Sequence, residues 1–421
     1  MKKILPLLIG CLLSVTGIAQ EQQISLSMLY DKLEQHYPSA DKLRIRNEIT
    51  GIQQQLSQTG WYPEVTVGAS TSWQSEVTEV PFVPNGPEFS QDHYTVSLDI
   101  VQPVFEAGRV SKMKRLNQIQ GEVANASTEV EMQSLRRQID QIYFGILQGR
   151  KNLEILQVLT HDLEEQLSSI ESRVKNGVLL PGNKYSLEAE LLKVEQQKTG
   201  VEEQIKGGFE MLSILSGAEL NDRVELEIPE TSGLNEENEF YRAEYELFDA
   251  RQQILNSQLE LSGSDKLPVI TAFGKTAYGR PGFNAFDNDL HFYWMVGLKA
   301  QWSFRSWRNS DKKAQVLELE KDELQTSEDA FTRQLKAGIS KQQYRIESLN
   351  KQIELDGQVL ELRTKVVAEK KHQLNEGVIT STEFITELNA ENRARLNLEL
   401  HKIQLMQAKY EYQTLKGDIW K

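Results

Sequence analysis

The sequence is nearly free of cysteine and has no long apolar run beyond its first residues. Cys11 is the only cysteine among the 421 residues, and it lies in the N-terminal apolar segment. If that segment is removed, neither disulfides nor thiol chemistry matter. No later stretch approaches the ~20 apolar residues that a membrane-spanning helix needs. These absences exclude a bundle of transmembrane helices but not a membrane β-barrel, whose strands alternate apolar and polar residues.

Clusters of basic residues are also missing. The formal net charge is −14, with 47 Lys and Arg against 61 Asp and Glu. Nucleic-acid binding needs a basic surface that neutralises phosphates. We therefore expect no nucleic-acid partner.

Motifs for catalysis and metal binding are absent as well. The sequence has no HExxH, P-loop or GxSxG motif and no Cys/His spacing typical of a metal site. Its six histidines are scattered: His36, His93, His161, His291, His372 and His401. We therefore expect no enzyme activity, no catalytic residue, no metal and no cofactor.

The N-terminus is typical of an export signal. Two lysines precede an apolar run, and Gly17-Ile18-Ala19 offers small residues before a cleavage point. We predict a signal peptide over residues 1–19. The run Leu8-Ile9-Gly10-Cys11 also resembles a lipoprotein cleavage box, so lipidation of Cys11 is the alternative.

The placement of proline leaves two long stretches of the chain free of it. No proline lies between Pro103 and Pro181, and none follows Pro281. An interior proline costs a helix ~3 kcal/mol, so we predict helices over residues 109–176 and 306–376. Apolar residues step by three and four, as in Leu156, Leu159, Leu163, Leu167, Ile170 and Val174. Such a stripe is the seam of packed helices, either in a larger helical assembly or in an ordinary dimeric coiled coil.

Four shorter segments have a two-residue period instead. Apolar and polar residues alternate most clearly from Phe292 to Phe304. This period places an apolar face opposite a polar face, as in a β-strand. The four predicted strands cover residues 64–75, 92–105, 268–278 and 291–304.

Aromatic residues cluster near the ends of these predicted strands. They are Trp61, Tyr62, Trp73, Phe105, Trp302, Phe304 and Trp307. Their positions fit the aromatic girdle of an outer-membrane barrel. The alternative is the core of a soluble β-sandwich, which would need more than four strands.

The chain also repeats itself. The segment Arg173–Leu179 aligns with Gln373–Ile379 at an offset of 200 residues, with a glycine at the same place in each. We predict a first repeat over 20–220 and a second over 240–421, joined by a polar, acidic linker over 221–239.

Each predicted repeat consists of a helix, a strand pair, a long helix and a returning helix. The returning helices are predicted over 183–216 and 380–416. Two strand pairs cannot close a barrel, and open sheet edges are not tolerated in lipid. If these strands enter a membrane, several chains must combine them.

This layout and several short motifs resemble the TolC-like outer membrane efflux protein family. The motifs are Pro63 and Pro268 at the start of two strands, Gln102–Phe105 followed by Gly108-Arg109, the two glycine turns, and Leu415–Trp420. The second half departs from the pattern, because Trp307 stands where the first half has Gly108. The resemblance extends over essentially the whole chain after the signal segment.

The resemblance implies a mixed α+β membrane protein with two internal structural repeats. Four strands from each chain of a homotrimer would form a transmembrane β-barrel, continuous with a long α-helical coiled-coil barrel. Such a protein is a passive outer-membrane exit duct of a tripartite efflux or type I secretion system. It receives substrate from an inner-membrane pump through a periplasmic adaptor. It lies in the outer membrane of a Gram-negative bacterium, with most of the chain in the periplasm, and the linker contributes to a belt around the tube.

The resemblance also implies roles at the ends of the long helices. The adaptor would dock at the two turns, on Gly177, Val178, Leu179, Gly377, Val378 and Ile379. Glu383 and Thr386 would lie at the periplasmic aperture, where one of the family's two acids is kept. The simpler roles are a helix turn for the glycines and, for Glu383, an acid at the positive end of a helix. The family's first-half acid corresponds to Asn183 and its basic partner to Ile379, so the polar lock of some members is absent or rebuilt.

A periplasmic coiled-coil adaptor without a pore is the alternative function. Such a protein would share the long helical hairpins, but it would lack two pairs of aromatic-faced strands.

Overall fold

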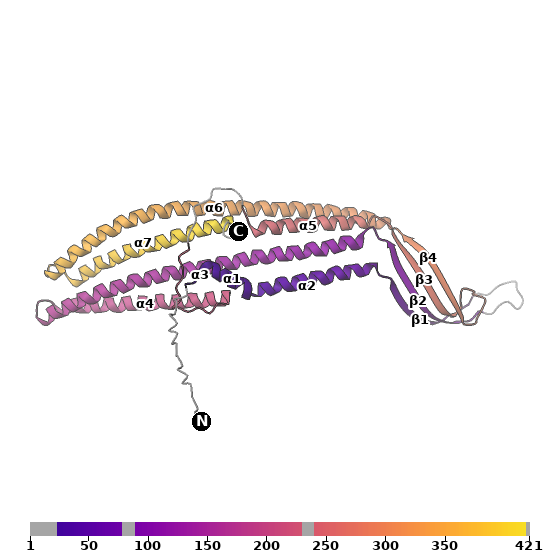
Figure 1. Cartoon of the computed structure of the whole chain (residues 1–421), viewed down its shortest axis with the longest axis horizontal. Helices are drawn as coiled ribbons and strands as arrows, with labels where there is room; N and C mark the ends of the chain where they lie inside the picture. Colours follow the sequence, from indigo (N-terminus) through magenta and orange to yellow (C-terminus); the bar gives the residue numbers. More distant parts are fainter. Residues whose placement is uncertain (1–22, 78–88, 230–239, 418–421) are drawn as a thin grey trace, which may run out of the picture. The chain divides into compact units, whose positions relative to one another are not determined.

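The protein combines long helices with one four-stranded antiparallel sheet, which confirms the predicted mixed fold. The computed structural model describes residues 23–77, 89–229 and 240–417, so the predicted signal peptide lies outside the described residues. The elements, shown in Figure 1, are α1 (Leu26–His36), α2 (Pro38–Gln58), the 3-10 helix η1 (Thr59–Trp61), β1 (Glu64–Trp73), β2 (Asp92–Phe105), α3 (Arg109–Lys175), α4 (Pro181–Ser216), α5 (Ala243–Ser264), β3 (Val269–Arg280), β4 (His291–Gln301), α6 (Phe304–Asn375) and α7 (Ser381–Lys416). None of the helices in the described ranges combines the length and the apolar character needed to cross a bilayer.

The second join between strand and helix differs from the prediction. β4 ends at Gln301 rather than at 304, and α6 begins at Phe304 rather than at 306. The alternation continues through Phe304 in the sequence, but Ser303 caps the helix. The Ser306 N–H lies 3.1 Å from the Ser303 carbonyl oxygen and 3.4 Å from its Oγ. A serine hydroxyl favours this position because it accepts hydrogen bonds from the first turn of a helix.

The first join is made by a different device. Ala107 and Gly108 have φ values of 56° and 72°, and the Arg109 N–H bonds to the Glu106 carbonyl at 3.1 Å, so the chain makes a tight turn before α3 begins. The Glu106 carboxylate then accepts a hydrogen bond of 2.8 Å from the N–H of Val110. The two halves thus share their elements but not the way in which strand passes into helix.

The described residues form two compact units. One unit contains α1, α4, α7 and the later parts of α3 and α6. The other contains the sheet, α2, α5 and the earlier parts of α3 and α6.

An apolar core runs along the helices of the first unit. It contains the stripe seen in the sequence, with Leu163 and Ile170 of α3 fully buried. Leu187 of α4, Leu374 of α6 and Phe384 of α7 pack into the same cluster. Burying a side chain of this size stabilises the fold by about 1.5–3 kcal/mol, so this seam holds the four helices together.

Buried polar groups in the same unit connect α1 to α3 and α7. The Tyr30 hydroxyl donates a hydrogen bond to Asp140 and lies 2.9 Å from the hydroxyl of Tyr410. Burial raises the pKa of Asp140 to about 7, and the nearby carboxylate of Glu411 adds to the rise. A carboxyl group in this position is therefore protonated in the folded chain under mildly acidic conditions.

The first part of the predicted linker pairs with the start of the described chain. Ile24 and Leu226 form a parallel β-bridge. The Ile24 N–H donates to the Glu225 carbonyl at 2.9 Å, and the Tyr143 hydroxyl donates to the Ile24 carbonyl at 2.8 Å. The described part of the linker is therefore fixed to the first unit, while residues 230–239 lie outside the described residues.

The buried carboxyl group predicts how stability depends on pH. Because the pKa of Asp140 is about 7 when folded and 3.8 otherwise, the folded chain holds one extra proton between these values. The stability that this proton provides is complete below pH 3.8 and is lost as the pH rises to 7, with a slope on the order of 1 kcal/mol per pH unit. The Asp140→Asn variant has no titratable group at this position. The melting temperature of this variant should therefore rise relative to that of the wild type as the pH increases from 5 to 8.

The control is Asp31→Asn, which changes an exposed carboxylate on α1. Its difference from the wild type should stay constant across the same pH range. A constant difference for Asp140→Asn as well would contradict the role of Asp140.

Candidate functional site: hairpin turns and sheet faces

The two long hairpins turn in the same way. The first hairpin turn (residues 176–180) and the second (residues 376–380) each contain a glycine with φ of 73° or 74°. The Gly177 N–H bonds to the Val174 carbonyl at 3.0 Å, and the Val178 N–H bonds to the Arg173 carbonyl at 2.9 Å. The second turn repeats both bonds at 3.0 and 2.9 Å. This pair of bonds is a Schellman motif, which requires the left-handed conformation that glycine adopts without strain.

The predicted docking residues divide into two groups by exposure. Val178 and Val378 are 63% and 73% exposed, and the two glycines beside them are also exposed. Leu179 and Ile379 instead pack against the apolar core of the helices. The turns therefore expose an apolar side chain and bare backbone, while the next residue anchors each turn.

Glu383 is engaged at the start of α7. Its carboxylate accepts hydrogen bonds from the N–H and hydroxyl of Thr380, at 2.8 and 2.9 Å, and the Glu383 N–H lies 3.3 Å from that hydroxyl. This reciprocal arrangement is a capping box. The hydrogen bonds from Thr380 lower the pKa of Glu383. Within one chain, then, the exposed Glu383 carboxylate caps a helix and stays ionised.

Thr386, the second predicted aperture residue, is exposed one turn further along α7. Its hydroxyl donates a 2.9 Å hydrogen bond to the Thr382 carbonyl. A hydroxyl occupied in this way contributes polarity to the surface without adding charge.

Two residues connect the hairpins to each other, and the sequence did not reveal these contacts. The Asn183 carboxamide oxygen accepts a 2.9 Å hydrogen bond from the N–H of Ser381 at the start of α7. The Arg173 guanidinium donates a 3.0 Å bond to the Leu374 carbonyl near the end of α6. Each bond satisfies a backbone group at a helix end of the opposite repeat. The two bonds therefore hold the two hairpin turns next to each other. Their partners lie about 200 residues away, and no local pattern identifies them.

The sheet brings the strand pairs of the two repeats together in the order β1-β2-β3-β4 (Figure 1). Register places Val67, Leu98, Thr276 and Trp294 in one row across all four strands. The side chains in this row lie on the face where most residues are apolar and exposed, Val67 being 74% exposed. A single chain thus leaves a broad apolar surface uncovered.

The adjacent row lies on the opposite, polar face. It consists of Thr66, Asp99, Lys275 and Met295. Asp99 pairs with Lys275 at 3.6 Å and accepts a 2.8 Å hydrogen bond from the hydroxyl of Ser97. The sheet therefore separates an apolar face from a face suited to water.

The predicted girdle residues lie at both ends of the sheet. Trp73 ends β1 at the loop end, and the other six lie where the strands meet the helices. There the Trp302 ring stacks on Trp307 at 6.4 Å and contacts Phe304 at 4.9 Å. The Trp302 indole N–H donates to the Lys266 carbonyl at 3.0 Å. An aromatic ring with one satisfied polar end is suited to an interface between lipid and water.

Four aromatic residues that are not among the predicted girdle residues also lie on the sheet. Tyr94, Tyr278, Phe292 and Trp294 lie on the apolar face near the loop end of the sheet, and all are exposed. Phe292 and Trp294 belong to the alternating pattern, which is the signal that could have identified them. With Trp73 they form a second aromatic band.

The chain is similar to known outer membrane proteins in sequence and in fold. The profile described as "Outer membrane efflux protein" matches residues 29–217. Among solved structures, the outer membrane protein VceC of Vibrio cholerae is similar with a TM-score of 0.69 at 15% identity, covering 93% of this chain and 95% of VceC. The CmeC outer membrane channel of Campylobacter jejuni has a TM-score of 0.69 at 14% identity, covering 93% and 85%.

A third similar structure is the MtrE outer membrane channel of Neisseria gonorrhoeae, with a TM-score of 0.63 at 13% identity, covering 93% and 88%. A search of curated proteins finds no match. The profile covers the first repeat, and the similarity in fold extends over both repeats. Residues 29–217 thus match the outer membrane efflux protein family, and the chain shares the fold of VceC, CmeC and MtrE over 93% of its length.

Proposed function

We propose that the protein is the outer-membrane exit duct of a tripartite export system. The observation that carries the proposal is the sheet, which has an exposed apolar, aromatic face and a polar reverse face. An apolar face of this kind needs lipid, and a polar reverse face suits a water-filled passage. The sheet would lie in the outer membrane and the helices in the periplasm.

A homotrimer would complete this duct. Within the described residues β1 pairs only with β2 and β4 only with β3, so both outer edges remain unpaired. Three copies would join these edges into a closed barrel, as lipid requires. The helices favour the same assembly, because α2 exposes apolar residues at coiled-coil spacing: Ile45, Ile49, Ile52 and Leu56.

A periplasmic adaptor would dock at the two hairpin turns. Val178, Leu180 and Val378 are exposed there. Leu180, which directly precedes the first residue of α4, Pro181, is 77% exposed. Exposed apolar side chains grouped in this way mark a surface for a protein partner. An inner-membrane pump would deliver cargo through that adaptor, in either an efflux or a type I secretion system.

Glu383 and Thr386 would form the aperture at the same end of the duct. Both are exposed, and Glu383 carries a charge that its capping bonds stabilise. Three copies of Glu383 around a narrow opening would favour cations over anions.

The alternative function, an adaptor without a pore, is tested by extraction. An adaptor would be released from membranes without detergent or through loss of a lipid anchor at Cys11. A duct would require detergent, because its apolar sheet face is covered by lipid.

Two neighbouring residues of β1 test the orientation of the sheet. Val67→Arg places a cation on the apolar face, which costs about 2–4 kcal/mol near the middle of a bilayer. We expect it to reduce the amount of oligomer in the outer-membrane fraction. Thr66→Arg is the matched control on the polar face and should assemble normally. Equal assembly of the two variants would contradict the membrane assignment.

Ion conductance in planar bilayers tests the aperture. The wild-type protein should give a small, steady, cation-selective conductance. Glu383→Gln should lose most of that selectivity, while the glutamine can keep the capping box with Thr380. Glu376→Gln, at an exposed site of the second hairpin turn, is the control and should stay selective. Unchanged selectivity in Glu383→Gln would remove Glu383 from the conducting path.

Site-specific photocrosslinking in cells tests the docking surface. A photoreactive residue at Val178 or Val378 should form an adduct with a periplasmic adaptor that mass spectrometry identifies. The same residue at Lys341, which is exposed on α6 away from the turn, should not. Adducts with the adaptor from Lys341 alone would place the docking surface elsewhere.

A further inference from the structure

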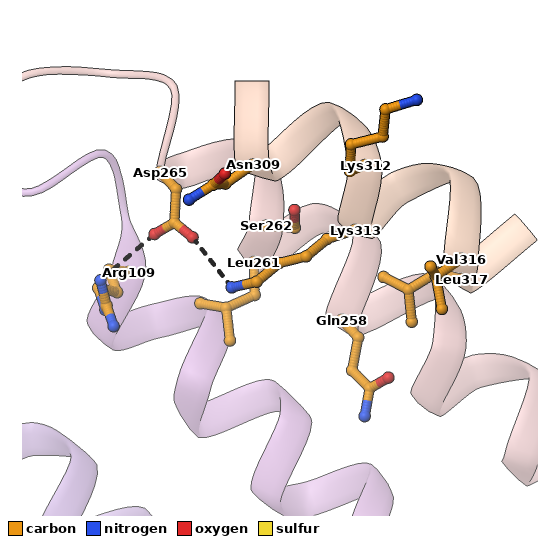
Figure 2. A pocket seen from close by; sticks show the side chains of 10 residues that line it. All are labelled: Arg109, Gln258, Leu261, Ser262, Asp265, Asn309, Lys312, Lys313, Val316 and Leu317. Atoms are coloured by element: carbon orange, nitrogen blue, oxygen red, sulfur yellow. Dashed lines mark hydrogen bonds and ion pairs between the residues drawn. The ribbon is translucent and has the colours of Figure 1, made fainter. Parts of the chain in front are cut away.

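A pocket of about 620 Å³ lies in the unit that contains the sheet. It is formed by the end of α5 and the first turns of α6, with Arg109 contributed by the start of α3 (Figure 2). Leu261, Val316 and Leu317 supply apolar walls. The pocket belongs neither to the hairpin turns nor to the aperture.

The pocket is positively charged within an acidic chain. Arg109, Lys312 and Lys313 line it, and Asp265 is the only acid among its lining residues. Figure 2 shows Arg109 and Lys313 converging on Asp265, whose carboxylate lies 3.4 Å from the guanidinium and 3.8 Å from the Lys313 ammonium group. Lys312 has only a neutral partner among the hydrogen bonds described, a 3.0 Å bond to Gln315. Since one carboxylate faces three cations, the pocket has a positive charge left to attract an anion.

The direction of the pocket follows from the aromatic residues on α6. Trp302 continues the alternation of the apolar sheet face, and Trp307 stacks on it. At about 100° per residue, Asn309 and Val316 lie about 160–180° around α6 from Trp307. Both line the pocket, so the wall that α6 contributes lies on the side of this helix away from Trp307 and the apolar face. In the proposed barrel that side is the passage.

We propose that this pocket binds an amphiphilic anion, a molecule with an apolar body and a carboxylate, sulfate or sulfonate head group. The apolar walls would hold the body, and Arg109, Lys312 and Lys313 would bind the head group by charge-assisted hydrogen bonds. The inference rests on the proposed function, because it names a class of cargo for the duct. A membrane phospholipid is not the proposed occupant, since the wall that α6 contributes lies away from the lipid-facing side.

Protection of a thiol tests binding without reference to conductance. Cys11 is the only natural cysteine, so Val316→Cys in a Cys11→Ser background places a single thiol in the pocket. The variant, in phosphatidylcholine nanodiscs, is labelled with a small water-soluble maleimide. We expect 1-octanesulfonate to slow labelling with saturation. Three control compounds should not slow labelling: methanesulfonate has no apolar tail, octyl glucoside has no charge, and octyltrimethylammonium has a positive charge.

Two substitutions test whether the charge of the pocket contributes to binding. Lys313→Gln in the Val316→Cys protein should weaken the protection by octanesulfonate about threefold to tenfold. Asp265→Asn removes the competing carboxylate and should strengthen it. The control thiol, Lys336→Cys on an exposed site of α6, should be labelled at the same rate with every probe.

Several outcomes would overturn the inference. Equal protection by octyl glucoside would make the pocket an uncharged apolar groove, and protection by phosphatidylglycerol nanodiscs alone would make it a lipid site. A Val316→Cys thiol that maleimide does not reach would show that a neighbouring copy closes the pocket. Conductance measured on the same protein keeps the proposals apart: a conducting protein without head-group-dependent protection refutes only the pocket, and protection without conductance refutes only the duct.

Discussion

The unpaired edges of the four-stranded sheet constrain the rest of the molecule. β1 and β4 each have a partner strand on one side within the described chain. In lipid, an unpaired row of N–H and C=O groups costs several kcal/mol per group, so no open sheet is stable there. Closure of the sheet with strands of further copies would therefore pair both edges and complete the barrel whose outer surface is the apolar face. The exposed coiled-coil stripe on α2 is consistent with such an assembly, because its apolar residues also lack a packing partner within the described chain.

The alternation of the strands determines which residues meet lipid and which meet water. A shift of one residue would exchange the row of Val67 and Trp294 with the row of Asp99 and Lys275, so the register is strongly specified. The pairing of β2 with β3 shifts between Pro103 and Phe105, where a proline has no N–H to donate to a neighbouring strand. That irregularity lies at the end of the sheet, next to the turn that begins α3. It leaves the two faces intact over the rest of the sheet.

The sequence predicted the helices and strands from local patterns, missed one local helix cap, and gave no sign of the contacts between distant residues. The absence of proline identified α3 to within one residue at its end, and alternation identified all four strands. Alternation alone placed the end of β4 three residues too late, because it does not register that Ser303 caps a helix. The bonds of Asn183 and Arg173 join opposite repeats, and the Tyr30–Asp140–Tyr410 cluster joins three helices. Contacts of this kind depend on the folded arrangement and leave no periodic trace in the sequence.

Glu383 has the capping role that the sequence left open, and this role is compatible with the proposed place of Glu383 at the aperture. Its bonds to Thr380 belong to a capping box, and the pattern Thr-x-x-Glu is readable from the sequence alone. Those bonds lower the pKa of the carboxyl, and the positive end of α7 acts in the same direction. In a ring of three, mutual repulsion would raise the same pKa. A carboxylate that is held by its own helix can therefore keep its charge in a narrow aperture, whereas one without such support would take up a proton as the copies approach. In the proposed aperture, the cap would thus help Glu383 to keep its charge, and the two roles would support each other.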